Sequence, residues 1–165
     1  MENLMKIVVF GALNAGKTTF LERASKKELS VKGSYEGMTT SLDFTRLDYN
    51  GETVYLFTTP GHRRFDFMWE VLANGMRGAI LVIDSTVGIT EVDREIGGLI
   101  ESKGVPYVVA VNKSDLANLS LDMVREGLGI SAKVPVIPTS AIYGNGVDEV
   151  LHRLMELKNE RRGTE

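Results

Sequence analysis

The chain has 165 residues, of which 43% are hydrophobic and 25% are charged, and its net charge is −3. These values are ordinary for a globular protein with one core, and the charge gives no electrostatic footprint for nucleic acid. Cysteine is absent, which excludes disulfides, thiolate metal sites, cysteine nucleophiles and prenyl or palmitoyl anchors. No apolar run approaches the ~20 residues of a membrane span, and the N-terminus is not typical of a signal peptide. We therefore expect one soluble, cytoplasmic domain over residues 1–165.

The first strong pattern along the chain is a strand followed at once by a glycine-containing loop. Residues 6–10 (Lys-Ile-Val-Val-Phe) are typical of a buried strand, and residues 19–24 begin a helix. Between them, residues 11–18 read Gly-Ala-Leu-Asn-Ala-Gly-Lys-Thr, which fits G-x-x-x-x-G-K-[ST] at every fixed position. With 17 glycines a chance match is conceivable, but the strand before and the helix after favour a nucleotide-binding loop. Residues 11–18 are named the phosphate loop below.

The phosphate loop predicts specific contacts with a bound nucleotide. Its two glycines let the main chain turn tightly and approach an anion, and the helix that follows presents its positive N-terminal end. Lys17 can reach the β- and γ-phosphates, and the Thr18 hydroxyl can ligate Mg²⁺. The residues of this segment expected to contact the nucleotide are Asn14, Ala15, Gly16, Lys17, Thr18 and Thr19.

Beyond residue 24, apolar strand patterns alternate with helical patterns. Residues 26–34 lose periodicity and predict a loop, which residues 37–40 end. Asn50-Gly51 between the apolar runs at 42–49 and 53–57 predicts a hairpin of two antiparallel strands. Further strands are expected at residues 79–84, 106–111 and 134–137, and further helices around residues 65–72, 92–100, 119–128 and 147–157. The tail after Leu157 is charge-rich and without apolar periodicity, and its last residues, 161–165, are expected to be a frayed end.

This alternation predicts an α/β fold with a six-stranded, mostly parallel sheet, one antiparallel hairpin and helices on both faces. In such sheets ligands bind at the carboxyl ends of the strands. The motifs of the chain all lie at those ends, which is the strongest argument for a common site.

The segment Asn112-Lys113-Ser114-Asp115 directly follows the expected strand at 106–111. Guanine has adjacent donors at N1 and N2 that one carboxylate accepts together, whereas adenine has an acceptor at N1. Asp115 therefore predicts guanine, with strong discrimination because a mismatched buried carboxylate would be left unpaired. Asn112 can support either guanine N7 or the local loop, and the stem of Lys113 can lie over the ring.

A second base-binding segment, Thr139-Ser140-Ala141-Ile142, follows the expected strand at 134–137. A small residue here lets a backbone N–H reach the guanine O6 atom. Ser140, Ala141 and Ile142 are therefore expected to bind the nucleotide.

These motifs together resemble the Ras-like small GTPases of the P-loop superfamily. The phosphate loop, Thr39, Pro60-Gly61-His62, the segment at 112–115 and Ser140-Ala141 follow one another in the family's order. The resemblance implies GTP, GDP and Mg²⁺ binding, slow hydrolysis of GTP to GDP, and two switch loops that respond to the nucleotide. Within the superfamily, Thr-Thr-Pro-Gly in place of Asp-x-x-Gly, followed by Phe-Asp-Phe-Met-Trp, is most similar to the Mgl-type polarity GTPases and their prokaryotic relatives.

The resemblance also implies roles in hydrolysis. Lys17 and the loop amides would stabilise the transferring phosphoryl group. Thr39 is the expected first-switch ligand of Mg²⁺ beside Thr18, with Thr40 as the alternative. The Gly61 N–H would bind the γ-phosphate. His62, which stands where Ras-like proteins have glutamine and translational GTPases have histidine, would orient the attacking water; the alternative is an ordinary surface histidine.

Two residues depart from the family pattern. Thr58 stands where the family has the aspartate that supports Mg²⁺, and since a hydroxyl supplies no charge, another acid (Asp43 or Asp84) is expected to compensate. Leu13 stands where Ras-like proteins often have glycine close to the γ-phosphate, and its bulk would obstruct an arginine finger. Arg63 or the following arginine could act in cis, unless they are only a solvated basic pair.

Three functional hypotheses follow. The first is a Mg²⁺-dependent GTPase that hydrolyses slowly and acts as a molecular switch. The second, motivated by Thr58 and Leu13, is a GTP/GDP-binding regulatory module that barely hydrolyses and holds a protein partner. The third, a P-loop ATPase or kinase, is disfavoured by Asp115 and by the lack of an acceptor-binding insertion.

The helical stripe around residues 65–72 bears on partners. If the stripe of Phe65, Met68, Trp69 and Leu72 faces the core, the remaining apolar side chains of this helix point elsewhere and predict an interface for a protein effector or activator at the switch regions. These remaining side chains are Phe67 and Val71, and the alternative is that all six pack into the core. No nucleic acid, membrane segment or lipid anchor is expected.

Overall fold

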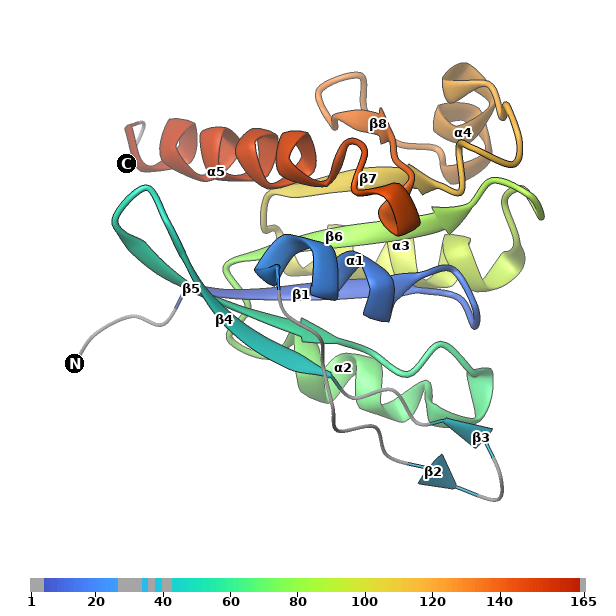
Figure 1. The fold of residues 1–165 in the computed structure, drawn as a ribbon, viewed down its shortest axis with the longest axis horizontal. Helices are drawn as coiled ribbons and strands as arrows, with labels where there is room; N and C mark the ends of the chain where they lie inside the picture. Colours follow the sequence, from blue (N-terminus) through green and yellow to red (C-terminus); the bar gives the residue numbers. More distant parts are fainter. Residues whose placement is uncertain (1–4, 27–33, 36–37, 40–42, 164–165) are drawn as a thin grey trace.

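A six-stranded sheet forms the middle layer of the molecule (Figure 1). The structure is a computed structural model that describes residues 5–26, 34–35, 38–39 and 43–163. The strands of the sheet are β1 (Met5–Gly11), β4 (Phe44–Tyr49), β5 (Glu52–Thr58), β6 (Gly78–Asp84), β7 (Tyr107–Asn112) and β8 (Val136–Pro138). The α-helices are α1 (Lys17–Ser25), α2 (Phe67–Ala73), α3 (Glu91–Lys103), α4 (Leu121–Leu128) and α5 (Val147–Gly163). Two short 3-10 helices are η1 (Arg63–Phe65) and η2 (Ala141–Tyr143).

The strand order is β4-β5-β1-β6-β7-β8, and only the β4–β5 pair is antiparallel. β6 and β7 are buried along their whole length, as expected for parallel strands covered on both faces. The predicted six-stranded, mostly parallel sheet with one hairpin is confirmed.

The β4–β5 hairpin has the two-residue turn that its sequence predicts. Asn50 and Gly51 have positive φ values of 50° and 82°, as the turn that matches the twist of the paired strands requires. The turn pairs Tyr49 with Glu52 and sets the register of all later pairs up to Phe44 with Phe57. This register decides which residues meet near the phosphate loop.

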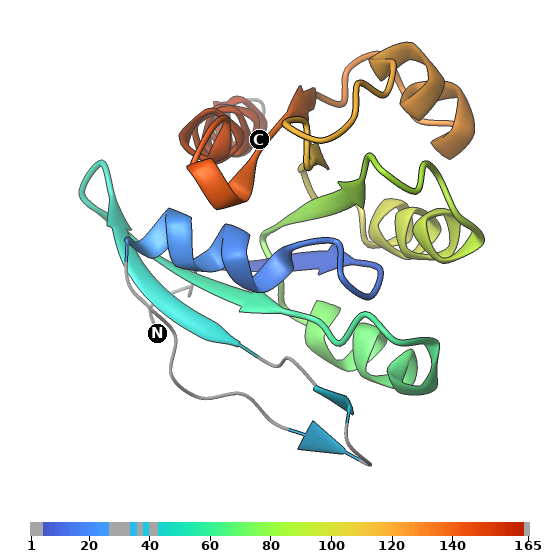
Figure 2. The ribbon, with the colours of Figure 1, turned by 45° about the vertical axis from the view of Figure 1, so that its right-hand side comes forward.

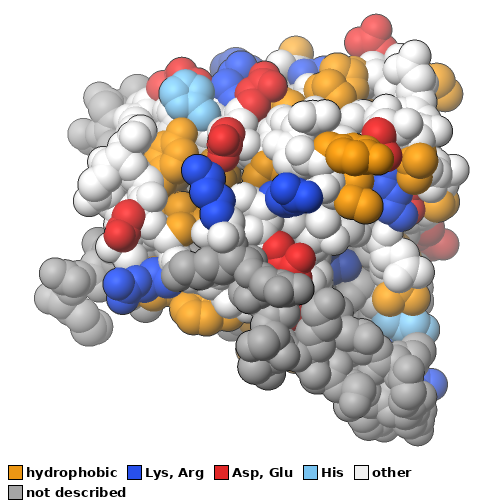
Figure 3. All heavy atoms as spheres, in the orientation of Figure 1, with side chains coloured by type: hydrophobic (Ala, Val, Ile, Leu, Met, Phe, Trp, Pro, Cys, Tyr) orange, Lys and Arg blue, Asp and Glu red, His pale blue; other side chains and the backbone are white. Residues whose placement is uncertain are grey.

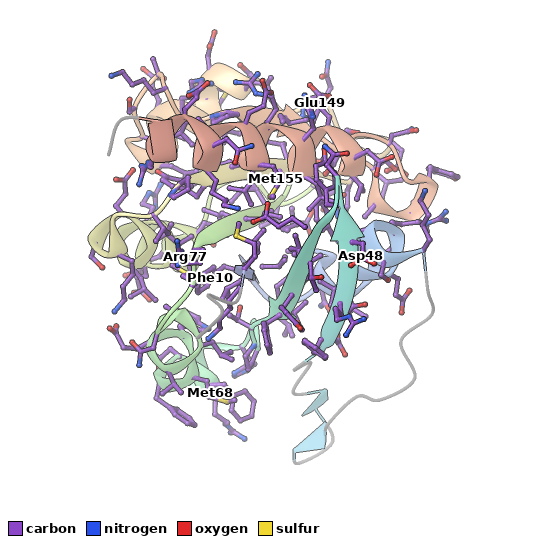
Figure 4. The ribbon with its side chains drawn as sticks, turned by 90° about the vertical axis from the view of Figure 1, so that its left-hand side faces the viewer. Phe10, Asp48, Met68, Arg77, Glu149 and Met155 are labelled. Carbon is purple, nitrogen blue, oxygen red and sulfur yellow. The ribbon has the colours of Figure 1, made fainter. Side chains whose placement is uncertain are left out.

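Helices cover both faces of the sheet, as Figure 2 shows. On β1, Ile7 and Val9 belong to the core beneath α1 and α5, whereas Val8 and Phe10 belong to the core beneath α2, α3 and α4. Met155 of α5 points towards the sheet in Figure 4. The alternation of a buried strand thus supplies two cores that hold the helices, and through them the loops, in place.

Two features of the structure differ from the sequence prediction. Residues Ser34–Tyr35 (β2) and Met38–Thr39 (β3) form a two-pair hairpin where a loop was predicted, because strands this short show no alternation. α5 continues past Leu157, where the predicted helix ended, and into the expected frayed end as far as Gly163: buried Lys158 pairs with Glu52, and Arg161 donates to the Gly104 carbonyl at 2.5 Å. In the part of the chain that the structure describes, no helix is long and apolar enough to cross a membrane.

Candidate functional site

The loops that follow the carboxyl ends of the parallel strands meet at one edge of the sheet, at the right of Figure 1. The phosphate loop follows β1, and the segment from Thr58 to His62 follows β5. Asn112 ends β7, and η2 follows β8. Four sequence motifs that are far apart in the chain therefore lie in one place.

The backbone of the phosphate loop requires glycine at position 16. Gly16 has a φ of 103°, and a Cβ there would lie 2.3 Å from Nδ2 of Asn112. Asn14 also has a positive φ, 66°, which asparagine tolerates better than most residues. α1 begins at the next residue, so Lys17, Thr18 and the residue after them form the helical turn that faces the loop. This is the anion-binding arrangement that the sequence predicts.

Lys17 lies inside the phosphate loop and is only 5% exposed. Its Nζ donates to the carbonyl oxygens of Gly11 and Ala12, both at 2.9 Å. Burial lowers the pKa of Lys17 to about 8, against the opposing effect of the Asp43 and Asp93 carboxylates. A buried ammonium held only by carbonyls is well placed for an anionic ligand at the loop.

The Asn112 side chain, at the end of β7, links the phosphate loop to the segment that follows β8. Its Nδ2 donates to the Ala15 carbonyl at 2.9 Å, and its Oδ1 accepts from the Thr139 hydroxyl at 3.1 Å and the Ala141 N–H at 2.9 Å. Of the two roles left open by the sequence, these bonds favour support of the local loop. They also engage the Ala141 N–H, so a contact of η2 with the guanine O6 atom stays a prediction.

A pocket of about 320 Å³ opens between the phosphate loop, the end of β7 and η2. It is lined by Gly16, Thr19, Asn112, Lys113, Asp115, Leu116, Ala141, Ile142 and Tyr143. All of these except Leu116 and Tyr143 were predicted to bind the nucleotide. Leu116, Ile142 and Tyr143 are largely exposed, and hydrophobic side chains gather over η2 in Figure 3. The pocket therefore has an apolar rim suited to a flat ring.

Asp115 stands at the mouth of this pocket and is exposed. The penalty for a mismatched base arises only when a base covers Asp115, so the discrimination predicted from the sequence stays a prediction. Ser140, which is 1% exposed, donates from its hydroxyl to Asp115 Oδ1 at 2.8 Å. Ser140 thus orients the predicted base-reading carboxylate.

Lys113 is held by Asp84, one of the two acids that the sequence offered as a substitute for the aspartate that supports Mg²⁺. Its Nζ donates to Asp84 Oδ2 at 2.7 Å, and its backbone carbonyl accepts from Ser85. Asp84 also accepts from the N–H and hydroxyl of Thr86. Burial alone would raise the pKa of Asp84, but these bonds outweigh burial and lower it. Asp84 is therefore bonded to the predicted guanine-binding segment at residues 112–115.

Gly61 packs directly on the phosphate loop. A Cβ at this position would lie 2.5 Å from the Leu13 nitrogen and 2.6 Å from Nζ of Lys17, so only glycine fits. Trp69 of α2 fixes the approach, because its Nε1–H donates to the Pro60 carbonyl at 2.8 Å. The helical stripe predicts only that Trp69 faces the core; this contact with Pro60 depends on tertiary packing, which the stripe does not indicate.

His62 is half-buried beside Gly61. Its Nδ1 accepts the Arg64 N–H at 3.0 Å, which assigns the ring proton of the neutral form to Nε2. The ring edge also contacts Phe65 in a T-shaped arrangement, with centroids 6.4 Å apart. Two contacts thus orient the ring and leave Nε2–H as its donor.

The first-switch threonine stays open between two positions. Thr39 ends β3, but its side chain lies outside what the structure describes, and Thr40 lies outside the described residues altogether. The side chain of Arg63 is likewise not described.

The Thr18 hydroxyl donates to Asp43 Oδ2 at 2.5 Å. Asp43 is held opposite Thr58: the Thr58 N–H donates to the Asp43 carbonyl and the Asp43 N–H donates to Thr58 Oγ1, both at 2.9 Å. The sequence carried the signal, because counting outward from the two-residue turn at Asn50 pairs residue 43 with residue 58.

Residues 31–160 match the protein family described as the elongation factor Tu GTP binding domain. The chain belongs to this GTP-binding domain family. It is 34% identical over 151 residues to an uncharacterized protein of Methanocaldococcus jannaschii, covering 92% of this chain and 95% of that protein. It is 30% identical over 158 residues to translation initiation factor IF-2 of Kosmotoga olearia, covering 90% of this chain.

This GTP-binding domain spans only 23% of that initiation factor. A solved structure of Era superposes on it with a TM-score of 0.77 and 20% identity, covering 95% of this chain and 57% of that one. The likeness to Era shows the fold. Family membership shows that the chain is a GTP-binding domain related to GTPases, a family that generally hydrolyses GTP.

Proposed function

We propose that residues 1–165 form one GTP-binding domain that binds GTP and GDP with Mg²⁺, hydrolyses GTP slowly and switches its conformation with the nucleotide. The observation that carries the proposal is the Asn112 side chain, which joins the phosphate loop at Ala15 to the base pocket at Ala141. A guanine read by Asp115 and phosphates held by Lys17 then belong to one ligand. The similar solved structure of Era is a complex with MgGDPNP, which supports a magnesium-bound nucleotide.

In this proposal hydrolysis depends on positioning and on charge stabilisation. Lys17 and the N-terminal turn of α1 would hold the phosphates, and the Gly61 N–H would contact the γ-phosphate. His62 would orient the attacking water through Nε2, since Nδ1 already accepts the Arg64 N–H. Thr18 and Thr39 would bind Mg²⁺. Intrinsic turnover below roughly one per minute is expected, as for unaided members of this class.

The test is single-turnover hydrolysis of GTP with Mg²⁺ by the wild-type protein and by the His62→Ala variant. We expect at least a tenfold slower rate in His62→Ala, because general positioning and proton-transfer groups contribute about 10²–10⁴-fold. His152→Ala is the matched control, since this second histidine lies on α5 and bonds to Tyr49. Equal rates in wild type and His62→Ala would remove the water-orienting role of His62.

A second candidate is a GTP/GDP-binding module with little intrinsic hydrolysis that holds a protein partner. The position of Leu13 favours it: its nitrogen lies beside Gly61, and its side chain is 48% exposed beside the phosphate loop, where it would obstruct an arginine finger. If neither wild type nor His62→Ala turns over while both bind GTP, this candidate replaces the first.

The proposed partner is a protein that contacts α2. Phe67 and Val71 are 65% and 64% exposed, whereas Phe65 and Trp69 are buried, so the alternative that all of the stripe packs into the core is wrong. Era is named in complex with 16S ribosomal RNA nucleotides, but charges of both signs are interspersed on the face in Figure 3 and the net charge is −3. We therefore propose that the partner is a protein. The similarity of the motif at residues 58–61 to the Mgl-type GTPases stays a prediction.

A further inference from the structure

Asp43 is a buried carboxylate with one oxygen unused. It is 2% exposed, and its Oδ2 accepts the Thr18 hydroxyl. Its Oδ1 is also buried and has no hydrogen-bond partner among the residues that the structure describes. Leaving one oxygen of a buried carboxylate unpaired costs free energy unless a cation or a donor satisfies it. The Asp43 Oδ1 atom therefore indicates a ligand.

Lys17 does not satisfy this atom. Its ammonium donates to the carbonyl oxygens of Gly11 and Ala12, and it feels Asp43 only through space. The negative charge of Asp43 thus lies beside the Thr18 hydroxyl, within the influence of Lys17 but not bonded to it.

The β4–β5 hairpin fixes the Asp43 backbone. Both of its polar backbone groups bond to Thr58, the residue that stands in the family's aspartate position. Thr58 is fully buried and supplies no charge. The acid that the pattern lacks on β5 is therefore present directly across the hairpin, one strand away.

The other acids near the site are engaged elsewhere. Asp84 pairs with Lys113 and Thr86. Asp93 has one unpartnered buried oxygen, but its Oδ2 caps α3 through the N–H and hydroxyl of Thr90. Asp43 alone of these three is bonded to the hydroxyl of Thr18.

We propose that Asp43 supplies the carboxylate of the Mg²⁺ site, in place of the aspartate that Thr58 replaces. This inference rests on the proposed function, because the ion is expected together with the nucleotide. Mg²⁺ prefers oxygen ligands and is usually held by one or two carboxylates plus substrate phosphates. The described residues fit that chemistry: a hydroxyl and a carboxylate lie side by side, and no three His, Cys, Asp or Glu side chains cluster among them. When bound, the ion would neutralise charge on the phosphates.

The test compares Asp43→Asn with Asp48→Asn. Both variants remove one negative charge from the same segment of chain, but Asp48 is exposed and accepts the Thr53 hydroxyl at 3.2 Å, away from Thr18. The readout is the dissociation rate of fluorescently labelled GDP across a Mg²⁺ titration, with a baseline in EDTA. In Asp43→Asn the half-saturating Mg²⁺ concentration should rise about 10–100-fold, and in Asp48→Asn it should not change.

Thermal melting in EDTA shows whether Asp43→Asn is folded. A second set of variants keeps the test decisive if it is not. Asp43→Thr alone should lose Mg²⁺ dependence, and Asp43→Thr combined with Thr58→Asp should regain it, because the acid returns on the other strand. A wild-type half-saturating Mg²⁺ concentration in Asp43→Asn and in Asp43→Thr would overturn the assignment while leaving GDP binding intact. Failure of the wild-type protein to bind GDP would instead overturn the proposed function.

Discussion

At the scale of single residues, the proposed base selection depends on the carboxylate of Asp115. Guanine offers it two donors, whereas the amide of an Asp115→Asn variant has one acceptor and one donor. Charge-assisted bonds contribute about 1.5–3 kcal/mol each, so we expect Asp115→Asn to bind GDP at least 30-fold more weakly. Xanthosine diphosphate has a carbonyl in place of the guanine amine, matches an amide, and should gain affinity for the variant.

Equilibrium titration of GDP and of xanthosine diphosphate into the wild-type protein and into Asp115→Asn measures this change of base preference. Asp122→Asn is the matched control, because Asp122 is an exposed acid in the first turn of α4. A variant that loses GDP without gaining xanthosine diphosphate would show that Asp115 shapes the pocket rather than reading the base.

We expect Asp84 to make the predicted guanine-binding segment at residues 112–115 sensitive to acid. Its pKa is lowered because the bonds from Lys113 and Thr86 outweigh burial. A carboxyl whose pKa is lower in the folded state contributes stability above its unfolded pKa, near 4, and loses it as the pH falls further. Asp84→Asn should therefore be less stable than wild type at pH 7, and the difference should shrink below about pH 5. Urea unfolding of both proteins across this range measures it; a difference independent of pH would contradict the pairing.

At the scale of elements, α2 presents two surfaces with opposite energetic roles. Trp69 is 5% exposed, and Trp69→Ala should cost about 3–5 kcal/mol of unfolding free energy through the cavity that it leaves. Phe67 and Val71 are mostly exposed, so replacing both with serine should change that free energy by less than about 0.5 kcal/mol each. Urea denaturation of the three proteins separates the surfaces. A large loss in the double variant would mean that these residues support the core.

Trp69, the only tryptophan of the chain, should report on the proposed nucleotide-dependent movement of the segment from Thr58 to α2. Its bond to the Pro60 carbonyl ties it to Gly61 and the phosphate loop. Replacing GDP with a non-hydrolysable GTP analogue should change the tryptophan emission, and Gly61→Ala should largely abolish this change because its Cβ would clash with Leu13. Identical emission of the wild-type protein in the two states would contradict a nucleotide-dependent movement of α2.

Elements were more predictable from sequence than the contacts between them. Continuous apolar runs such as β6 and the Asn50 turn determine structure locally, so the sheet and hairpin were predicted. The bond between Thr18 and Asp43 depends on the cross-strand register, which the position of the Asn50 turn implies but which no single strand pattern displays. The bond from Trp69 to Pro60 and the extension of α5 by Lys158 depend on packing between distant segments, which no local pattern indicates.

At the scale of the whole molecule, the site exists only when distant segments are folded together. Ala15 in the phosphate loop, Asn112 at the end of β7 and Ala141 in η2 are joined by two hydrogen bonds. A ligand that spans these three segments binds the folded state alone and stabilises it by mass action, by about 2.7 kcal/mol at a concentration of 100 Kd. For a chain of this size that corresponds to a rise of about 5–10 °C in the melting temperature.

Thermal melting with GDP, GTP or ATP at equal concentration, each with Mg²⁺, tests this linkage. GDP and GTP should each produce the full rise, and ATP should produce little, because Asp115 finds only one donor on adenine. The Asp115→Asn variant should lose the rise with GDP while keeping its melting temperature without nucleotide, since Asp115 is exposed and bonded only to Ser140 among the side chains described around it. Equal rises with ATP and GTP would contradict the guanine assignment, because a site that reads only phosphates would stabilise the fold equally with either nucleotide.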